Sequence, residues 1–256
     1  MTLPLLAWPG ALAIGLSLGL LGSGGSILTV PVLVYLVGQD EKHAIAGSLL
    51  VVGVIALTSS LGYLRRQALD VAAILAFGLP GMLGTWIGAW TSAWIPGSIQ
   101  LILFALVMTT AAAIMLSSRT TTQDAAGTRG TLPKQIAAGL GVGAITGLVG
   151  VGGGFLIVPA LVAVTRLDLH RAIGTSLAII TLNSAVGFAA HATRLAGSLD
   201  WNTLAILTAI GIAGGLLGQR LASRLPQAVL RRIFAIALIV LAIAILAESG
   251  SRALRA

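Results

Sequence analysis

Residues 22–31 read GSGGSILTVP and residues 150–159 read GVGGGFLIVP, so one glycine-rich stretch occurs twice in the chain, 128 positions apart. Each copy interrupts a long apolar run and closes on a proline. The same offset relates Ala44-Ile45 to Ala172-Ile173 and Ser48-Leu49 to Ser176-Leu177. After a shift of two positions the match continues from Leu69-Asp70 to Leu199-Asp200 and from Gly84 to Gly214. Several long-range matches in one register indicate two homologous halves.

The composition places the chain in a membrane. Of its 256 residues, 57% are hydrophobic and only 9% are charged, which is too little polar surface to cover a soluble globule. The apolar runs are about 20 residues or longer, as membrane helices require, whereas transmembrane barrels alternate apolar and polar residues over short strands. The net charge of +8 comes from Lys and Arg at helix ends, where topology explains it, so we expect no nucleic-acid partner.

Cofactor chemistry is not indicated. The chain has no cysteine, which excludes disulfides and thiolate metal sites, and its 3 His and 7 acidic residues lie mostly between the apolar runs. We therefore expect no cofactor and no metal site. A membrane enzyme is disfavoured because no carboxylate pair, His cluster or activated nucleophile is visible in the apolar runs.

The apolar runs divide the chain into a first repeat (1–117), a polar linker (118–134), a second repeat (135–247) and a tail (248–256). The linker is rich in Thr, Gly and Arg, which predicts a mobile segment. The runs of the first repeat are 5–37, 44–64, 71–94 and 98–117, and those of the second are 135–165, 172–192, 201–223 and 229–247.

The runs 5–37 and 135–165 are too long for one ordinary crossing at 1.5 Å per residue, and glycines break both near the middle. If each were a single kinked span, the 15 Lys and Arg would divide 7 against 8 between the two sides. If each is a hairpin that returns to its own side, they divide 11 against 4, as the positive-inside rule expects. We therefore predict hairpins, with the linker in the cytoplasm and both termini outside.

A hairpin and three crossings make an odd number of crossings per half, so the second half is inverted relative to the first. The predicted fold class is an all-α integral membrane protein of two inverted-topology repeats. Each repeat is a glycine-broken helical hairpin plus three transmembrane helices.

The tips of the two hairpins are the predicted substrate site. A helix that starts there leaves its first N–H groups unpaired and presents the positive end of its dipole, and glycines let an anion approach those groups. Two facing helix starts hold an anion without a buried Arg or Lys. Close helix packing is the alternative explanation of the glycines. The tip residues expected to bind are Ser23, Gly24, Gly25, Ser26, Gly152, Gly153 and Gly154.

Other polar residues inside the apolar runs are further candidates. Ser48, Thr175 and Ser176 follow the hairpins, and their hydroxyls either donate to the anion or bond back to their own helix. The amide of Asn183 either joins two helices or binds substrate. The candidates for proton coupling or gating are His43, His170, His191 and Arg171.

At these residues the sequence resembles the TauE/SafE family of membrane proteins, often labelled sulfite exporters. The resemblance rests on Gly22-Ser23-Gly24-Gly25-Ser26 with Pro31, on Gly150-Val151-Gly152-Gly153-Gly154 with Pro159, and on Ala172-Ile173-Gly174-Thr175-Ser176. It covers nearly the whole chain. The first copy departs from the second in having Gly47-Ser48 where the second has Thr175-Ser176. The resemblance implies secondary transport that exports sulfite or organosulfur anions such as sulfonates.

We therefore expect a secondary transporter that exports sulfite or a small sulfonate across the bacterial inner membrane, with this sulfur-containing anion and membrane lipids as its partners. A homo-oligomer is compatible with the sequence. The alternatives are an anion channel and a transporter of another small oxyanion such as thiosulfate or sulfate. A cation transporter is disfavoured because all seven acidic residues fall near helix ends or in loops.

Overall fold

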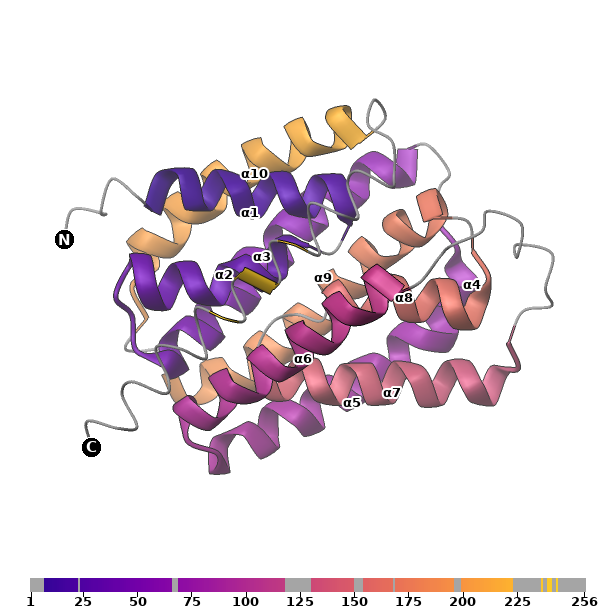
Figure 1. The fold of residues 1–256 in the computed structure, drawn as a ribbon, viewed down its shortest axis with the longest axis horizontal. Helices are drawn as coiled ribbons and strands as arrows, with labels where there is room; N and C mark the ends of the chain where they lie inside the picture. Colours follow the sequence, from indigo (N-terminus) through magenta and orange to yellow (C-terminus); the bar gives the residue numbers. More distant parts are fainter. Residues whose placement is uncertain are drawn as a thin grey trace.

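The structure is a computed structural model that describes residues 7–22, 24–65, 69–117, 130–149, 154–167, 169–195 and 199–222, with single positions between 236 and 243. Every element in these ranges is helical (Figure 1). Five helices are long and apolar enough to cross a membrane, which confirms the predicted all-helical membrane class. These five are Glu41–Leu64, Val71–Trp94, Leu132–Val149, Arg171–Ala192 and Trp201–Leu221.

The helices follow the apolar runs with small shifts at their ends. Helix α7 begins at Leu132, three residues before the expected start, because Pro133 is favourable in a first helical turn. The run expected at 229–247 lies almost wholly outside the described residues. The first half contains α1 (Ala7–Leu21), α2 (Gly25–Pro31), η1 (Val32–Leu36), α3 (Glu41–Arg65), α4 (Val71–Ala73), η2 (Ile74–Gly78), α5 (Leu79–Thr91), η3 (Ser92–Trp94) and α6 (Gly97–Ser117). The second contains α7 (Leu132–Val149), α8 (Gly154–Thr165), α9 (Leu169–Leu195) and α10 (Trp201–Ala222).

The chain reverses direction between α1 and α2. Gly22 has a φ of +67°, a left-handed conformation that favours glycine and turns the chain. A methyl group at Gly25 would overlap the carbonyl oxygen of Ile14, and one at Gly10 would lie 3.2 Å from Val32. The start of α2 therefore lies beside the end of α1. At 1.5 Å per residue α1 is about 22 Å long, which is shorter than the hydrocarbon core of about 30 Å.

The chain also reverses between α7 and α8. The N–H of Gly130, two residues before α7, donates to the carbonyl of Val164 in the last turn of α8, at 2.8 Å. The end of α8 therefore returns to the start of α7. Residues 150–153, which connect the two helices, lie outside the described part of the chain.

The first arm of each hairpin packs on a helix of the other half. α1 lies along α10 and α7 lies along α5 (Figure 1), and these are the two most closely packed helix pairs in the described chain. Methyl groups at Gly15 and Gly19 would overlap the carbonyl oxygens of Gly211 and Gly215 respectively. The order of these contacts shows that α1 and α10 run parallel, with their backbones in direct contact.

The α5–α7 pair repeats this arrangement. Methyl groups at Gly143 and Gly147 of α7 would overlap the carbonyl oxygens of Gly81 and Thr85 of α5. These two helices therefore also run parallel at a distance that only glycine permits.

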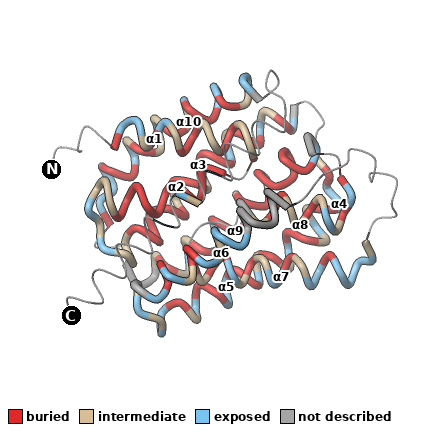
Figure 2. The backbone as a smooth tube through the Cα atoms, in the orientation of Figure 1, coloured by how far each residue is buried: buried red, intermediate tan, exposed pale blue. Residues whose placement is uncertain are grey.

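Helices α3 and α9 form the centre of the bundle. About 67% and 61% of their membrane-spanning residues are buried, against 33% for α7 and α10, and Figure 2 shows this burial along both central helices. Leu49 packs on Gly187, and Gly53 lies 3.0 Å from the Ser184 side chain. Because the earlier residue of α3 meets the later residue of α9, the two central helices are antiparallel.

Each central helix also has a parallel neighbour. α3 runs parallel to α10 and α9 runs parallel to α5, so α1, α3 and α10 share one direction and α5, α7 and α9 share the opposite one. The contacts that fix these directions are Gly47 with Leu204, Ile55 with Gly211, Gly78 with Ile179 and Gly81 with Asn183.

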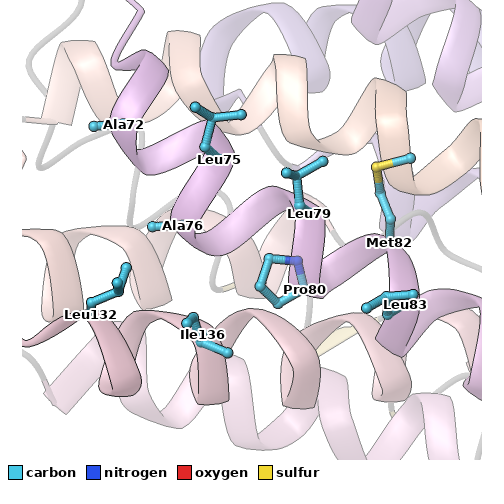
Figure 3. A pocket seen from close by; sticks show the side chains of 9 residues that line it. All are labelled: Ala72, Leu75, Ala76, Leu79, Pro80, Met82, Leu83, Leu132 and Ile136. Atoms are coloured by element: carbon cyan, nitrogen blue, oxygen red, sulfur yellow. The ribbon is translucent and has the colours of Figure 1, made fainter.

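An apolar groove of about 800 Å³ lies on the outer surface of α7 and of the continuous α4, η2 and α5 segment (Figure 3). Leu75, Leu83 and Leu132 are each more than half exposed there. The groove offers no side-chain hydrogen-bond donor, so it suits lipid tails and not an anion. Its lining residues are Ala72, Leu75, Ala76, Leu79, Pro80, Met82, Leu83, Leu132 and Ile136.

Asp70 and Asp200, which correspond in the two halves, both cap helix N-termini. Asp70 accepts a hydrogen bond from the N–H of Ala73 at 2.8 Å. Asp200 accepts from the N–H of Thr203 at 3.1 Å and from its hydroxyl at 2.6 Å. The hydroxyl bond in particular lowers the pKa of Asp200 below its ordinary value of 3.8.

We expect Asp200→Ala to lower the free energy of unfolding by about 1 kcal/mol at pH 7, the typical value of an N-cap. Because folding lowers the pKa, the charge-dependent stabilisation is complete above pH 3.8 and is lost as the pH falls through the folded value. Denaturant unfolding in detergent at pH 7 and pH 3 measures both effects. Asp200→Asn keeps a capping oxygen and should lose only the pH-dependent part; an equal loss in both variants at pH 7 would contradict a capping role.

Candidate functional site

The first glycine stretch lies against the start of α9. The Ser176 hydroxyl lies 3.0 Å from the Gly22 carbonyl, to which it donates, and 2.8 Å from the Ile173 carbonyl of its own helix. Ile173 itself packs on Gly22. The structure therefore brings together the hairpin tip of one half and a predicted hydroxyl of the other, and both Ser176 and the adjacent Thr175 are fully buried.

The helix that starts at this tip has no side-chain cap. Gly24 occupies the N-cap position in a helical conformation, and the helix continues without a break from Gly25 to Leu36. Ser26 and Thr29 in its first turns are fully buried, and the Thr29 hydroxyl donates to the Gly25 carbonyl at 3.0 Å. A buried, uncapped helix start presents N–H groups and a positive dipole end, as an anion site needs.

Two glycines of the first stretch, Gly25 and Gly22, have different structural roles at this tip. Gly25 leaves room for the Ile14 carbonyl, so its missing side chain is explained by packing of the hairpin. Gly22, which was quoted in the motif but not assigned to the site, takes the turn conformation and contacts α9. Ser23 lies outside the described residues.

Thr175 has a structural contact. Its hydroxyl oxygen accepts the backbone N–H of Asp70 at 3.0 Å, which ties the start of α9 to the start of α4. A hydroxyl that accepts this bond still has its own proton to donate. Thr175 therefore remains compatible with a ligand contact.

The second hairpin tip is described only in part. Gly154 begins α8 and is buried, whereas Gly152 and Gly153 lie outside the described residues. Ser48, which corresponds to Ser176, is fully buried, and its hydroxyl donates to the Ile45 carbonyl at 2.8 Å. That bond to its own helix is the alternative considered for these hydroxyls. α2 and α8 are in contact, so the starting helices of the two tips are neighbours.

Asn183 is fully buried, and neither atom of its amide has a hydrogen-bond partner in the described structure. It lies against Gly81, where a methyl group would come within 3.2 Å of the amide nitrogen. Its described contacts are thus with α5, and not with the tip at Gly22. An amide without a partner in hydrocarbon is costly, so Asn183 stays a candidate for contact with a ligand or water.

Two hydroxyls close to Asn183 were not singled out from the sequence. Thr85 of α5 and Ser184 of α9 are fully buried, and their hydroxyl oxygens have no partner in the described structure. Ser and Thr are common in membrane helices, where they usually bond back to a carbonyl. Only the packing, which leaves these two without that bond, distinguishes them.

His191 is buried in the last part of α9, with 6% of its surface exposed. Its Nδ1 lies 2.9 Å from the Gly187 carbonyl and its Nε2 lies 3.1 Å from the Ser92 hydroxyl. The Lys42 ammonium donates to the backbone carbonyls of Ser92 at 2.7 Å and Ile95 at 2.6 Å. His191 therefore belongs to a polar cluster at the end of α5.

The other coupling candidates lie elsewhere. His43 is partly exposed, with Nδ1 3.4 Å from a carboxylate oxygen of Asp40, and Arg171 is exposed in the first turn of α9. The side chain of His170 lies outside the described part. Among the residues that the structure describes, no three His, Asp or Glu side chains gather where a metal ion could bind.

Comparisons with known proteins give matches over nearly the whole chain. A family profile described as "Sulfite exporter TauE/SafE" matches residues 7–245. A "Probable membrane transporter protein" of Xylella fastidiosa (strain 9a5c) is 36% identical over 241 residues, covering 91% of this chain and 90% of the relative. The "Probable membrane transporter protein YunE" of Bacillus subtilis (strain 168) is 29% identical over 246 residues, covering 87% and 89%. No solved structure gives a significant match.

Proposed function

The chain belongs to the TauE/SafE family of membrane transporters, and from this membership we propose that it is a secondary transporter that exports sulfite or a small organosulfonate across the bacterial inner membrane. The anion binds midway through the membrane at the starts of the helices that follow the two glycine breaks. In this arrangement both termini lie outside the cell and the linker lies in the cytoplasm. The 11-to-4 division of Lys and Arg supports that orientation.

Two inverted-topology repeats are part of this proposal. By the sequence offset, α1 corresponds to α7, α3 to α9 and α5 to α10. In each of these pairs the two helices belong to opposite direction groups, as the glycine contacts described above indicate. Inverted repeats place a substrate site at their interface, which suits alternating access from the two sides.

The single observation that carries the proposal is the buried, uncapped start of α2 at Gly24 and Gly25, held against Ser176 of the other half. Its N–H groups attract an oxyanion without any buried cation. A helix terminus carries only about half of an elementary charge. An anion site made of helix termini therefore releases its substrate more readily than a site built on Arg.

The membrane potential is sufficient to drive export. Moving one elementary charge across 100 mV is worth about 2.3 kcal/mol, so a dianion that leaves a cell with a negative interior gains about 4.6 kcal/mol per 100 mV. Sulfite export therefore requires no ATP-binding domain.

We expect proteoliposomes that contain the purified protein to release sulfite in response to an imposed potential. Ser176→Ala removes the hydrogen bond to the tip and should lower this flux roughly tenfold, the equivalent of about 1.4 kcal/mol. The matched control is Thr181→Ala in the same helix, because the Thr181 hydroxyl bonds only back to the Leu177 carbonyl in the described contacts.

Competition by sulfoacetate, thiosulfate and sulfate identifies the anion class in the same assay. Competition by thiosulfate or sulfate alone would assign another oxyanion, and a very high flux that does not saturate would indicate a channel. Absence of any anion flux from correctly inserted protein would contradict the proposal. An equal loss of flux in Ser176→Ala and Thr181→Ala would show that the hydrogen bond from Ser176 to the Gly22 carbonyl has no specific role in transport.

A further inference from the structure

Polar side chains follow the interface between α5 and α9 at successive helical turns. Gly81 faces Asn183, Thr85 faces Gly187, and Ser92 faces His191. Asn183 and His191 are eight residues apart on α9, a rise of about 12 Å. These side chains, Asn183, Thr85, Ser92 and His191, are called the polar file below. The polar file runs from the middle of the α9 span to the membrane face at which α5 and α9 end.

The inner part of this file is unsatisfied within the protein. The amide of Asn183 and the hydroxyl of Thr85 are fully buried and have no described partner, whereas Ser184, which also lacks one, faces Gly53 of α3. In a bilayer each such group is costly to bury unless water or a ligand pairs with it. Two of them about one helical turn apart on the same interface point to bound water, which needs two to four polar partners.

The corresponding interface between α3 and α10 shows that packing does not require these groups. By the sequence offset, Ile55 corresponds to Asn183, Tyr63 to His191 and Ala222 to Ser92. Ile55 packs on Gly211 much as Asn183 packs on Gly81. This interface has one hydroxyl without a described partner, Ser59, and one amide, Gln219, whose side chain donates to the Ser59 carbonyl at 2.6 Å. Of these two interfaces, as far as the structure describes them, the α5–α9 interface is the one with the unpartnered amide Asn183 and with a histidine where the other has Tyr63.

The contacts of His191 provide hydrogen bonds in both of its protonation states. The Ser92 hydroxyl has one proton and two acceptors, the Ala89 carbonyl at 2.8 Å and His191 Nε2 at 3.1 Å. With neutral His191, Ser92 donates to Nε2. With protonated His191, Nε2–H donates to the Ser92 oxygen and Ser92 donates to Ala89, while Nδ1–H donates to Gly187 in both states. His191 therefore gains a proton while both of its ring nitrogens and the Ser92 hydroxyl keep hydrogen-bond partners.

The charged groups around His191 come from neighbouring helix ends. Lys42 at the start of α3 donates to the carbonyl of Ser92. Glu41 lies against Gly97 at the start of α6, and His43 pairs with Asp40. On α9 itself, the side chain of Arg194 lies outside the described residues. The described part of α5 contains no Asp, Glu, Lys or Arg.

We propose that the α5–α9 interface is a hydrated proton path, in which His191 takes a proton from the membrane face where α9 ends, and Asn183 and Thr85 relay it through bound water to the middle of the bilayer. The coupling of this proton to anion exit rests on the transport function proposed above. Exchange of an outgoing anion for an incoming proton moves net charge in the direction that a negative interior favours.

The experiment uses proteoliposomes loaded with a short alkanesulfonate, which stays ionised at every pH used. Lowering the outer pH from 8 to 6 should accelerate efflux at least tenfold and acidify an internal pH dye. His191→Gln and Asn183→Ile should each remove both responses. Tyr63→Phe, at the position equivalent to His191 in the other interface, is the matched control and should retain them.

Folding is checked by unfolding temperature, and Asn183→Ile introduces the residue that already occupies the equivalent site. If His191→Gln fails to fold, His191→Tyr introduces the equivalent residue there. Retention of the pH response in either file variant would overturn the proposal. Histidine NMR of the purified protein tests the proton site without any transport: one signal that titrates between pH 5 and 8 must be absent in the His191 variant. A titrating His191 without anion flux would mean that the transport function alone had failed.

Discussion

Gly143→Ala is expected to disrupt the bundle, whereas Gly141→Ala, two residues away on the same helix, is expected to be harmless. A methyl group at Gly143 would overlap the Gly81 carbonyl oxygen and lie within 2.9 Å of the Gly81 Cα, so α5 and α7 would have to separate. At Gly141 nothing lies within 4 Å. Overpacking of this kind typically costs about 1–3 kcal/mol or more.

The pair of variants cancels the effect of helix propensity. Replacing glycine by alanine inside a helix favours the helix by about 1 kcal/mol at both positions, so the difference between the variants reports the interhelical contact. Thermal unfolding and size-exclusion chromatography in detergent measure it. Equal unfolding temperatures for Gly143→Ala and Gly141→Ala would contradict the close parallel packing of α5 on α7.

Gly22→Ala is expected to lower anion flux at least tenfold, while Gly38→Ala leaves it nearly unchanged. Both glycines have positive φ values, +67° and +79°, so both substitutions carry the same left-handed strain of about 1–2 kcal/mol. Only at Gly22 would the new methyl group meet the other half, 2.5 Å from the Ile173 side chain and 3.0 Å from its Cα. The first hairpin tip would therefore be displaced from α9.

Sulfite efflux and the unfolding temperature are measured together for these two variants. The left-handed strain lowers both unfolding temperatures, the contact with Ile173 lowers that of Gly22→Ala further, and only Gly22→Ala should lose flux. If both variants transport equally well, the contact between Gly22 and Ile173 has no part in the transport cycle.

Much of the helical architecture could be predicted from composition and from the repeat. The two apolar runs of more than 30 residues contain glycines at their centres, and the chain reverses between α1 and α2 at Gly22 and again between α7 and α8. Hydropathy could not predict which helices pair. The parallel contacts of Gly15 with Gly211 and of Gly143 with Gly81 depend on backbone approach, which leaves no trace in an apolar sequence beyond the glycines themselves.

The glycine stretch and Ser176 could be selected from the sequence, whereas the buried hydroxyls of Thr85 and Ser184 could not. The glycine stretch and Ser176 are in contact in the structure. Both could be selected because both belong to the repeated segments. Gly25 shows the limit of the motif, since a glycine needed for packing and one needed for an anion look alike in sequence. Thr85 and Ser184 show a second limit, because the absence of a hydrogen-bond partner is a property of the packed structure alone.

The parallel seating of α1 on α10 has a consequence for how the protein is made. The ribosome completes residues 7–21 before it begins residues 201–222, an interval of roughly 10–40 s at 5–20 residues per second. During that time the glycine face of α1 has no helix to receive it, and the segment is too short to stay in the bilayer as an ordinary span. Although α1 is synthesised well before α10, it is thus among the last helices to pack, and a nascent chain stalled before α10 should leave α1 accessible to protease.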